Sequence, residues 1–149
     1  MWKNLAFVAV VAAIAGAFAP AASAQSASTL DYQFFRTRVE PVFLKKRAGH
    51  ARCYVCHAES NNAFRLEKLA AGEKSWSDEQ SRRNFSTVST PVTPGDPAAS
   101  RLLQQPLAPE AGGNVFHSGG RQFASKDDPD YRTLAQWISG ATPAARSKK

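Results

Sequence analysis

Methionine, cysteine and histidine are scarce in this sequence, and their scarcity limits its chemistry. The 149 residues contain one methionine, two cysteines and three histidines. Because Met1 is the only methionine, a processed chain has no thioether sulfur to offer a metal. Two cysteines cannot by themselves fill a zinc site of four ligands. The sequence also has no internal repeat and no sustained alternation of apolar and polar residues, so it predicts neither a repeat architecture nor a sheet.

The first 24 residues have the pattern of an export signal. Lys3 supplies a positive charge, the run 5–19 is apolar and uncharged, and Ala22-Ser23-Ala24 fits a signal-peptidase site. We therefore expect residues 1–24 to be cleaved and the mature chain to act in the periplasm or outside the cell. The apolar run is shorter than the roughly 20 residues of a membrane span, and no later stretch is as apolar, so we expect no retained anchor.

The remaining chain suits one domain. Residues 25–140 are long enough for a single core, and we expect the basic stretch 141–149 to be a disordered tail. The full sequence has 19 lysines and arginines against 12 aspartates and glutamates, and without Lys3 the remaining chain has a formal net charge of 18 − 12 = +6. The basic residues are scattered, and an export signal argues against a nucleic-acid role. We attribute the charge to solubility and to the attraction of acidic partner proteins.

Hydrophobic spacing and capping residues predict an all-α fold of short helices and long loops. Apolar residues recur at helical spacing over residues 30–44, where Pro41 should end or kink the helix. Ser77 followed by Gln80 forms a capping box, which predicts a helix that reaches Val88. Further short helices are expected over residues 63–69, 98–104 and 129–138. Four glycines make residues 111–125 a loop, of the kind that positions ligands.

The residues at positions 53–57 carry the chemistry. Cys53, Cys56 and His57 have the C-x-x-C-H spacing that attaches haem in c-type proteins. Two cysteines three positions apart can add to the two vinyl groups on one edge of the porphyrin. The next residue, a histidine, can then bind the iron through a neutral imidazole nitrogen. We therefore predict one covalently attached haem c per chain, with His57 as its proximal iron ligand.

The same cysteine pair has three other known uses. A redox-active C-x-x-C of the thioredoxin kind needs a βαβ setting, which the sequence lacks. A zinc site needs a fourth ligand beyond the two cysteines and His57. A structural disulfide suits an exported protein, but closing so small a loop adds little stability. The histidine directly after the second cysteine and the export signal favour haem attachment over all three.

With this motif in place, the sequence resembles the cytochrome c-like superfamily, in particular its small monohaem bacterial domains. The resemblance covers Phe34-Phe35 in the first helix, Cys53 to His57, Pro94-Gly95-Asp96-Pro97, Ser100-Arg101-Leu102-Leu103, and Tyr131 and Trp137 in the last helix. It implies a cytochrome c-like fold wrapped around one haem. It also implies that the first and last helices pack together through these aromatic residues. The usual proline soon after the proximal histidine is absent, since none follows His57 before Pro91. The partner of the second ring nitrogen of His57 is therefore open.

His117 is the predicted second axial ligand. It lies in the glycine-rich loop before the last helix, where the superfamily usually supplies its distal ligand, and no methionine can take that role. We expect Phe116 and Phe123 to anchor this loop. His50, the other histidine, lies three residues before Cys53 and is expected at the surface or near a haem propionate.

Ligation by His57 and His117 fills both axial positions and removes the thioether that raises the potential of Met/His cytochromes. We therefore predict a low-potential electron carrier, not an enzyme. It would exchange electrons with partner proteins that have acidic docking surfaces. Two alternatives stay open: a five-coordinate haem enzyme or gas sensor, and a haem subunit of a larger electron-transfer assembly. Arg52, Arg121 and Trp76 are candidate partners of the haem propionates.

Overall fold

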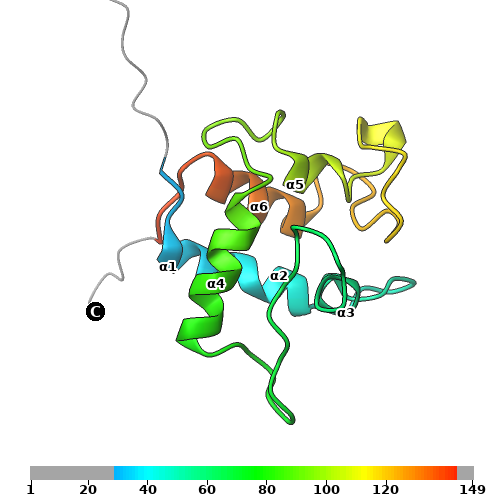
Figure 1. Cartoon of the computed structure of the whole chain (residues 1–149). Helices are drawn as coiled ribbons and strands as arrows, with labels where there is room; N and C mark the ends of the chain where they lie inside the picture. The colour runs from blue at the N-terminus through cyan, green and yellow to red at the C-terminus, as the bar shows by residue number, and fades with distance from the viewer. Residues whose placement is uncertain (1–28, 144–149) are drawn as a thin grey trace, which may run out of the picture.

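A computed structural model describes residues 29–143 of the chain. The predicted signal peptide at 1–24 and positions 144–149 of the predicted tail lie outside the described residues. Within residues 29–143 the only strand-type pairing is an isolated bridge between Leu107 and Phe123, and every regular element is helical. The prediction of an all-α chain with short helices and long loops is therefore confirmed (Figure 1).

The helical elements follow one another in the order α1 (Tyr32–Phe34), η1 (Phe35–Val39), α2 (Glu40–Leu44), α3 (Cys53–His57), α4 (Asp78–Ser89), α5 (Arg101–Gln104), η2 (Pro109–Ala111) and α6 (Pro129–Ile138). The elements α1, η1 and α2 are consecutive, so they form one helical segment, as the apolar spacing over residues 30–44 predicts. Pro41 does not end it, because the chain takes a π-helical turn, η1, just before the proline and α2 then starts with Pro41 in its first turn.

Helix α4 begins where its capping box predicts. The Ser77 hydroxyl accepts a hydrogen bond from the Gln80 amide at 3.2 Å, and the Gln80 side chain accepts one from the Ser77 amide at 3.1 Å. The helix ends at Ser89, before Pro91. Helix α6 is equally predictable, since Asp128 caps it by accepting hydrogen bonds from the amides of Asp130 and Tyr131.

The helix predicted over residues 63–69 is wrong. The backbone amides of this segment bond to distant groups instead of to carbonyls four residues earlier. Leu66 donates to the carbonyl of His57 at 3.0 Å, Glu67 to the Asn84 side chain at 2.8 Å, and Leu69 to the Tyr54 hydroxyl at 2.9 Å. These tertiary hydrogen bonds hold the segment in an irregular conformation. The helix predicted over residues 98–104 is shorter, because Asp96 caps a turn at Ala98 and Ala99 before α5 begins.

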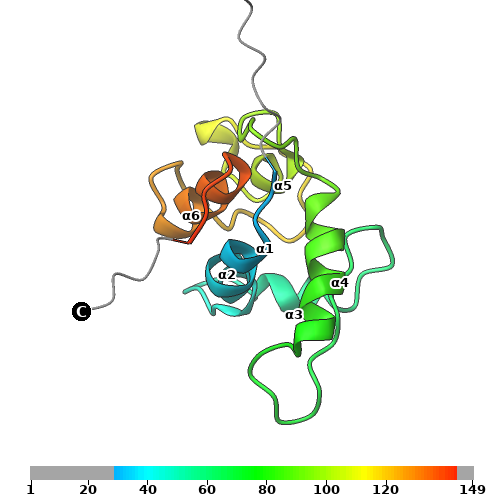
Figure 2. The ribbon, with the colours of Figure 1, turned by 90° about the vertical axis from the view of Figure 1, so that its left-hand side faces the viewer.

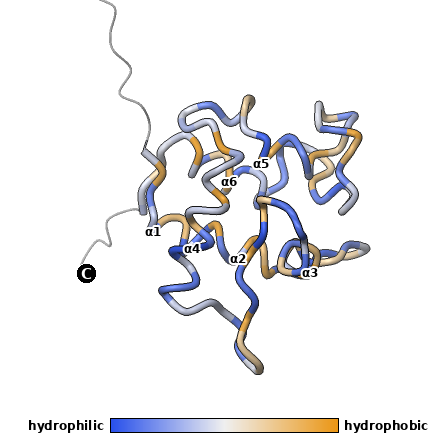
Figure 3. Tube along the Cα trace, viewed as in Figure 1, coloured by the Kyte–Doolittle hydropathy of each residue, from blue (hydrophilic) through white to orange (hydrophobic). Residues whose placement is uncertain are grey.

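The core forms where the first helical segment passes between α6 and α4 (Figure 2). Phe35 and Trp137 are fully buried there, with ring centroids 5.4 Å apart, and Phe85 of α4 packs against both. The aromatic contact expected between the first and last helices is therefore present. Apolar residues occur in short runs along helices and loops alike (Figure 3), and loop residues such as Leu66 and Phe123 are fully buried in the same core. Loops that pack in this way also line the cavity described in the next subsection.

One acidic side chain is buried in this core. Glu40 is 5 % exposed; one carboxylate oxygen accepts a hydrogen bond from Ser81 at 3.0 Å and lies 3.7 Å from Arg36, while the other has no partner. Burial raises the pKa of Glu40, and the opposing effects of Ser81 and Arg36 do not offset it. Because the pKa is raised in the folded state, the stabilising contribution of the protonated carboxyl is complete below the ordinary value of 4.5. It is lost as pH rises through the raised pKa.

Glu40→Gln should therefore change stability in a pH-dependent way. Near pH 4 the variant and the wild type should be about equally stable, because both side chains are uncharged. Near pH 7 the variant should be more stable by on the order of 1 kcal/mol, since it buries no charge. Urea unfolding at the two pH values measures this difference. A stability difference that is the same at both pH values would contradict the burial argument.

Candidate functional site

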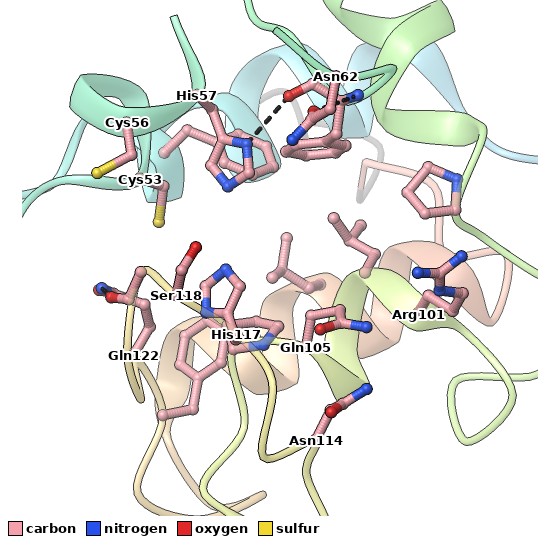
Figure 4. Close-up of a pocket in the computed structure, with 18 of the residues that line it drawn as sticks. Cys53, Cys56, His57, Asn62, Arg101, Gln105, Asn114, His117, Ser118 and Gln122 are labelled. Carbon is pink, nitrogen blue, oxygen red and sulfur yellow. Dashed lines mark hydrogen bonds between the residues drawn. The ribbon is translucent and has the colours of Figure 1, made fainter. Parts of the chain in front are cut away.

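A cavity of about 700 Å³ lies between α3 and the loop that joins α5 to α6 (Figure 4). This volume lies within the range of about 300–1,000 Å³ that is usual for ligand and cofactor sites. Many of its lining residues are apolar, among them Val42, Phe43, Phe64, Leu102, Phe123 and Leu134. All four residues singled out from the sequence, Cys53, Cys56, His57 and His117, also line it. The fold thus brings together residues that lie up to sixty-four positions apart in the sequence.

Helix α3 holds the cysteines and His57 on one wall. Tyr54 anchors this helix, since its ring packs edge-on against Trp76 with centroids 5.7 Å apart and its hydroxyl accepts a hydrogen bond from the Leu69 amide. Cys53 is partly buried and Cys56 is exposed, and both are free thiols. Burial raises the pKa of the Cys53 thiol, although Arg47 opposes this rise. Cys53 is therefore a neutral thiol near pH 7 and lacks the lowered pKa of a catalytic or redox-active cysteine.

His117 lies on the opposite wall, in a loop that is closed at its base. Ala108 donates to the carbonyl of Phe123 at 2.9 Å and Gln122 donates to that of Pro106 at 2.8 Å. Phe123 is 1 % exposed and carries the guanidinium of Arg47 over its ring. Phe123 therefore anchors the loop as expected. The same expectation is wrong for Phe116, which is 88 % exposed, because the base of the loop reaches the core and its tip does not.

The two imidazoles face each other across the cavity. Their ring centroids are 6.3 Å apart and their planes differ by 16°, and Figure 4 shows the rings of His57 and His117 pointing toward one another from opposite walls. A metal–nitrogen bond is about 2.0–2.1 Å long and a ring nitrogen lies about 1.2 Å from its ring centre, so two imidazoles that bind one metal ion from opposite sides have centroids roughly 6.4 Å apart. The observed spacing therefore fits a single metal ion held between the rings.

The hydrogen bonds of the rings fix which nitrogen is left for a metal. Nδ1 of His57 lies 3.0 Å from the carbonyl oxygen of Phe64, and Nδ1 of His117 lies 2.7 Å from that of Gly120. A carbonyl oxygen only accepts, so each Nδ1 carries a proton, and in the neutral imidazole the lone pair is then on Nε2. A histidine held this way by a backbone carbonyl is the usual arrangement of a metal ligand. The Phe64 carbonyl is therefore the partner of the second ring nitrogen of His57, which the sequence leaves open.

The electrostatics of His57 favour the form that binds metals. Burial lowers the pKa of His57, and the neighbouring His117 lowers it further, while the hydrogen bond with Phe64 opposes this without offsetting it. His57 is therefore a neutral imidazole at neutral pH. A metal ion then needs no proton release from His57 before it binds.

The other residues considered from the sequence lie differently. His50 is exposed and does not line the cavity, as expected. Trp76 is 2 % exposed and donates to the carbonyl of Glu67, so it is a core residue and not a propionate partner. Arg121 pairs with Glu110 at 3.2 Å, outside the cavity, and only Arg52 of the three lines it. Arg101 also lines the cavity; in the sequence it belongs to the element Ser100-Arg101-Leu102-Leu103, which predicts no binding role for it.

The site supplies two facing ligands and not a cluster of them. Among residues 29–143, no three histidine, cysteine, aspartate or glutamate side chains gather as a bare metal-ion site, and no helix is long and apolar enough to cross a membrane. Two axial imidazoles suit a metal whose other positions are filled by a tetrapyrrole. Comparison with known proteins finds no family model, no curated protein and no solved structure that matches the chain.

Proposed function

We propose that this protein is an exported monohaem c-type cytochrome with a cytochrome c-like fold, and that it transfers electrons. Cys53 and Cys56 would attach the haem, and His57 and His117 would bind its iron from the two sides. The observation that carries the proposal is the pair of facing imidazoles, 6.3 Å apart, with both thiols on the same cavity. A haem bound there would supply a one-electron couple between ferric and ferrous iron.

The residues of the chain support electron transfer over substrate chemistry. His57 and His117 would occupy both axial positions and leave none for a substrate. Apolar side chains, including Phe43, Phe64 and Leu102, would surround the cofactor and exclude water. Imidazole in place of a methionine thioether favours a comparatively low reduction potential. The basic net charge of the mature chain, 18 − 12 = +6 without Lys3, favours partner proteins with acidic docking surfaces.

One observation favours a second function, a five-coordinate haem enzyme or gas sensor. His117 lies in a loop whose neighbouring residues Val115 and Phe116 are 68 % and 88 % exposed. Few packing contacts hold such a loop, so an added ligand can displace its histidine more readily than His57.

The visible and near-infrared spectrum of the mature holoprotein separates the two functions. An electron carrier with both histidines bound should be low-spin in both oxidation states. Its spectrum should change little when cyanide or carbon monoxide is added. High-spin bands that shift readily with either ligand would contradict the electron carrier and support the enzyme or sensor.

Gly119→Ala should weaken the ligation by His117. A β-carbon at position 119 would lie 3.1 Å from Cε1 of the His117 ring and 3.4 Å from Nε2, the nitrogen that would bind the metal. We expect this crowding to weaken the bond by about 1–3 kcal/mol and to produce a measurable high-spin fraction. Ser118→Ala removes atoms from the neighbouring cavity residue, so its spectrum should match the wild type. A fully low-spin Gly119→Ala protein would show that the loop accommodates the β-carbon without weakening the bond between His117 and the iron.

A further inference from the structure

The two ends of the cavity differ in chemistry (Figure 4). Cys53 and Cys56 lie at one end, and Arg101 lies at the other, with the side-chain amides of Asn62, Gln105 and Asn114 between Arg101 and the histidines. We propose that the Arg101 end of the cavity binds the two carboxylates of the haem. This inference depends on the proposed function and goes beyond it, because it assigns an orientation and a binding role to residues outside the C-x-x-C-H motif.

Arg101 has no protein partner in the part of the chain that the structure describes. No carboxylate of residues 29–143 lies within 4.0 Å of its guanidinium nitrogens, and these nitrogens donate no hydrogen bond to a described residue. Arg47, in contrast, pairs with Asp128 and Asp130. A guanidinium presents a planar fork of donors that matches a carboxylate. Its place on the cavity and its lack of an acidic neighbour make Arg101 suited to a carboxylate of the ligand.

The amides between Arg101 and the histidines also present donors. The side-chain oxygen of Asn62 accepts a hydrogen bond from the Phe64 amide at 2.9 Å, and that of Asn114 accepts one from the Phe116 amide at 2.8 Å. These bonds fix the oxygens toward the backbone, so each side chain has its NH₂ group left to donate. Carboxylates accept hydrogen bonds only, so an end of the cavity with an arginine and amide NH₂ groups is complementary to them.

The covalent attachment leads independently to the same orientation. The vinyl groups and the propionates of a haem lie on opposite edges of the porphyrin. If Cys53 and Cys56 bond to the vinyl edge, the propionates point away from α3 and toward Arg101. Arg52 also lines the cavity, but it directly precedes Cys53 and so lies at the vinyl end. Arg101 is therefore the cavity arginine placed to contact the propionates.

This contact should affect the reduction potential. A positive charge near the haem destabilises ferric iron more than ferrous iron and so raises the potential. Arg101→Gln should therefore lower the midpoint potential of the holoprotein and shift the propionate bending bands in its resonance Raman spectrum. Arg101→Lys should keep part of the wild-type potential, because the charge remains but the two-point contact is lost. Arg132→Gln removes the same charge from an exposed position on α6, away from the cavity, and should change neither quantity.

The salt concentration separates direct contact from a general charge effect. At about 1 M salt the Debye length falls to roughly 3 Å, so only a contact effect should persist. A lower potential and shifted Raman bands in Arg101→Gln at high salt would support the inference. If Arg101→Gln matches Arg132→Gln in both measurements while it carries covalent haem, the inference is wrong and the proposed function stands. A wild-type protein without covalent haem would overturn both.

Discussion

Cys53→Ala combined with Cys56→Ala should reduce covalently bound haem from one per chain to none. The chain has no other cysteine, so no thioether bond to a vinyl group can form in this variant. His57 and His117 keep their positions on the cavity walls, and any haem that the variant retains should therefore be extractable with acidified solvent. Haem staining after denaturing electrophoresis, together with the intact mass, measures the covalent fraction.

The matched control for this double variant is Val55→Ala. Val55 lies between the cysteines and is 46 % exposed, so its truncation alters the same helix, α3, and leaves both thiols in place. We expect this control to carry covalent haem at the wild-type level. Covalent haem in the double variant, or its loss in Val55→Ala, would contradict the assignment of the two cysteines. Each single variant should keep one thioether bond, which shifts the pyridine haemochrome band to longer wavelength.

His117→Ala should convert a low-spin six-coordinate haem into a high-spin five-coordinate one. His117 is the only other histidine on the cavity, since His50 lies outside it, and no methionine follows Met1. No described side chain of the usual axial type is therefore placed to replace it. Carbon monoxide should bind the reduced variant on the order of tenfold more tightly or better, because it no longer competes with His117 for the iron.

Two comparisons make the His117→Ala result specific. His50→Ala removes an exposed histidine and should leave the spectrum unchanged. Free imidazole added to His117→Ala should restore the low-spin spectrum, because it supplies the missing nitrogen without the loop. If His117→Ala keeps the wild-type spectrum and potential, His117 is not a ligand and the second axial position belongs to another group.

Local sequence signals predict much of the fold. Ser77 with Gln80 and Asp128 with Pro129 place the starts of α4 and α6, because a helix cap is formed by neighbours in the sequence. The segment 63–69 has an equally helical pattern, yet its amides bond to groups as distant as Asn84. These tertiary hydrogen bonds replace the helical ones, and the residues of the segment alone do not predict them.

Part of the candidate site is likewise predictable from the sequence, and part of it is not. The residue types and spacing of Cys53, Cys56 and His57 are enough to single out one wall of the cavity from the sequence alone. Two other features require geometry: the Phe64 carbonyl beside His57 has no sequence signature, and the position of Arg101 on the cavity depends on the fold. His117 is predictable because the sequence has so few alternatives to it.

The pyridine haemochrome of the exported protein tests the central proposal most directly. The full-length chain should be expressed in a host that attaches c-type haem in the periplasm, and the purified mature protein assayed for haem and weighed by intact mass spectrometry. We predict one haem per chain, bound through two thioether bonds, and a mass higher than that of the polypeptide by one haem. A mature protein with no covalent haem and with both thiols free to react with an alkylating reagent would contradict the account.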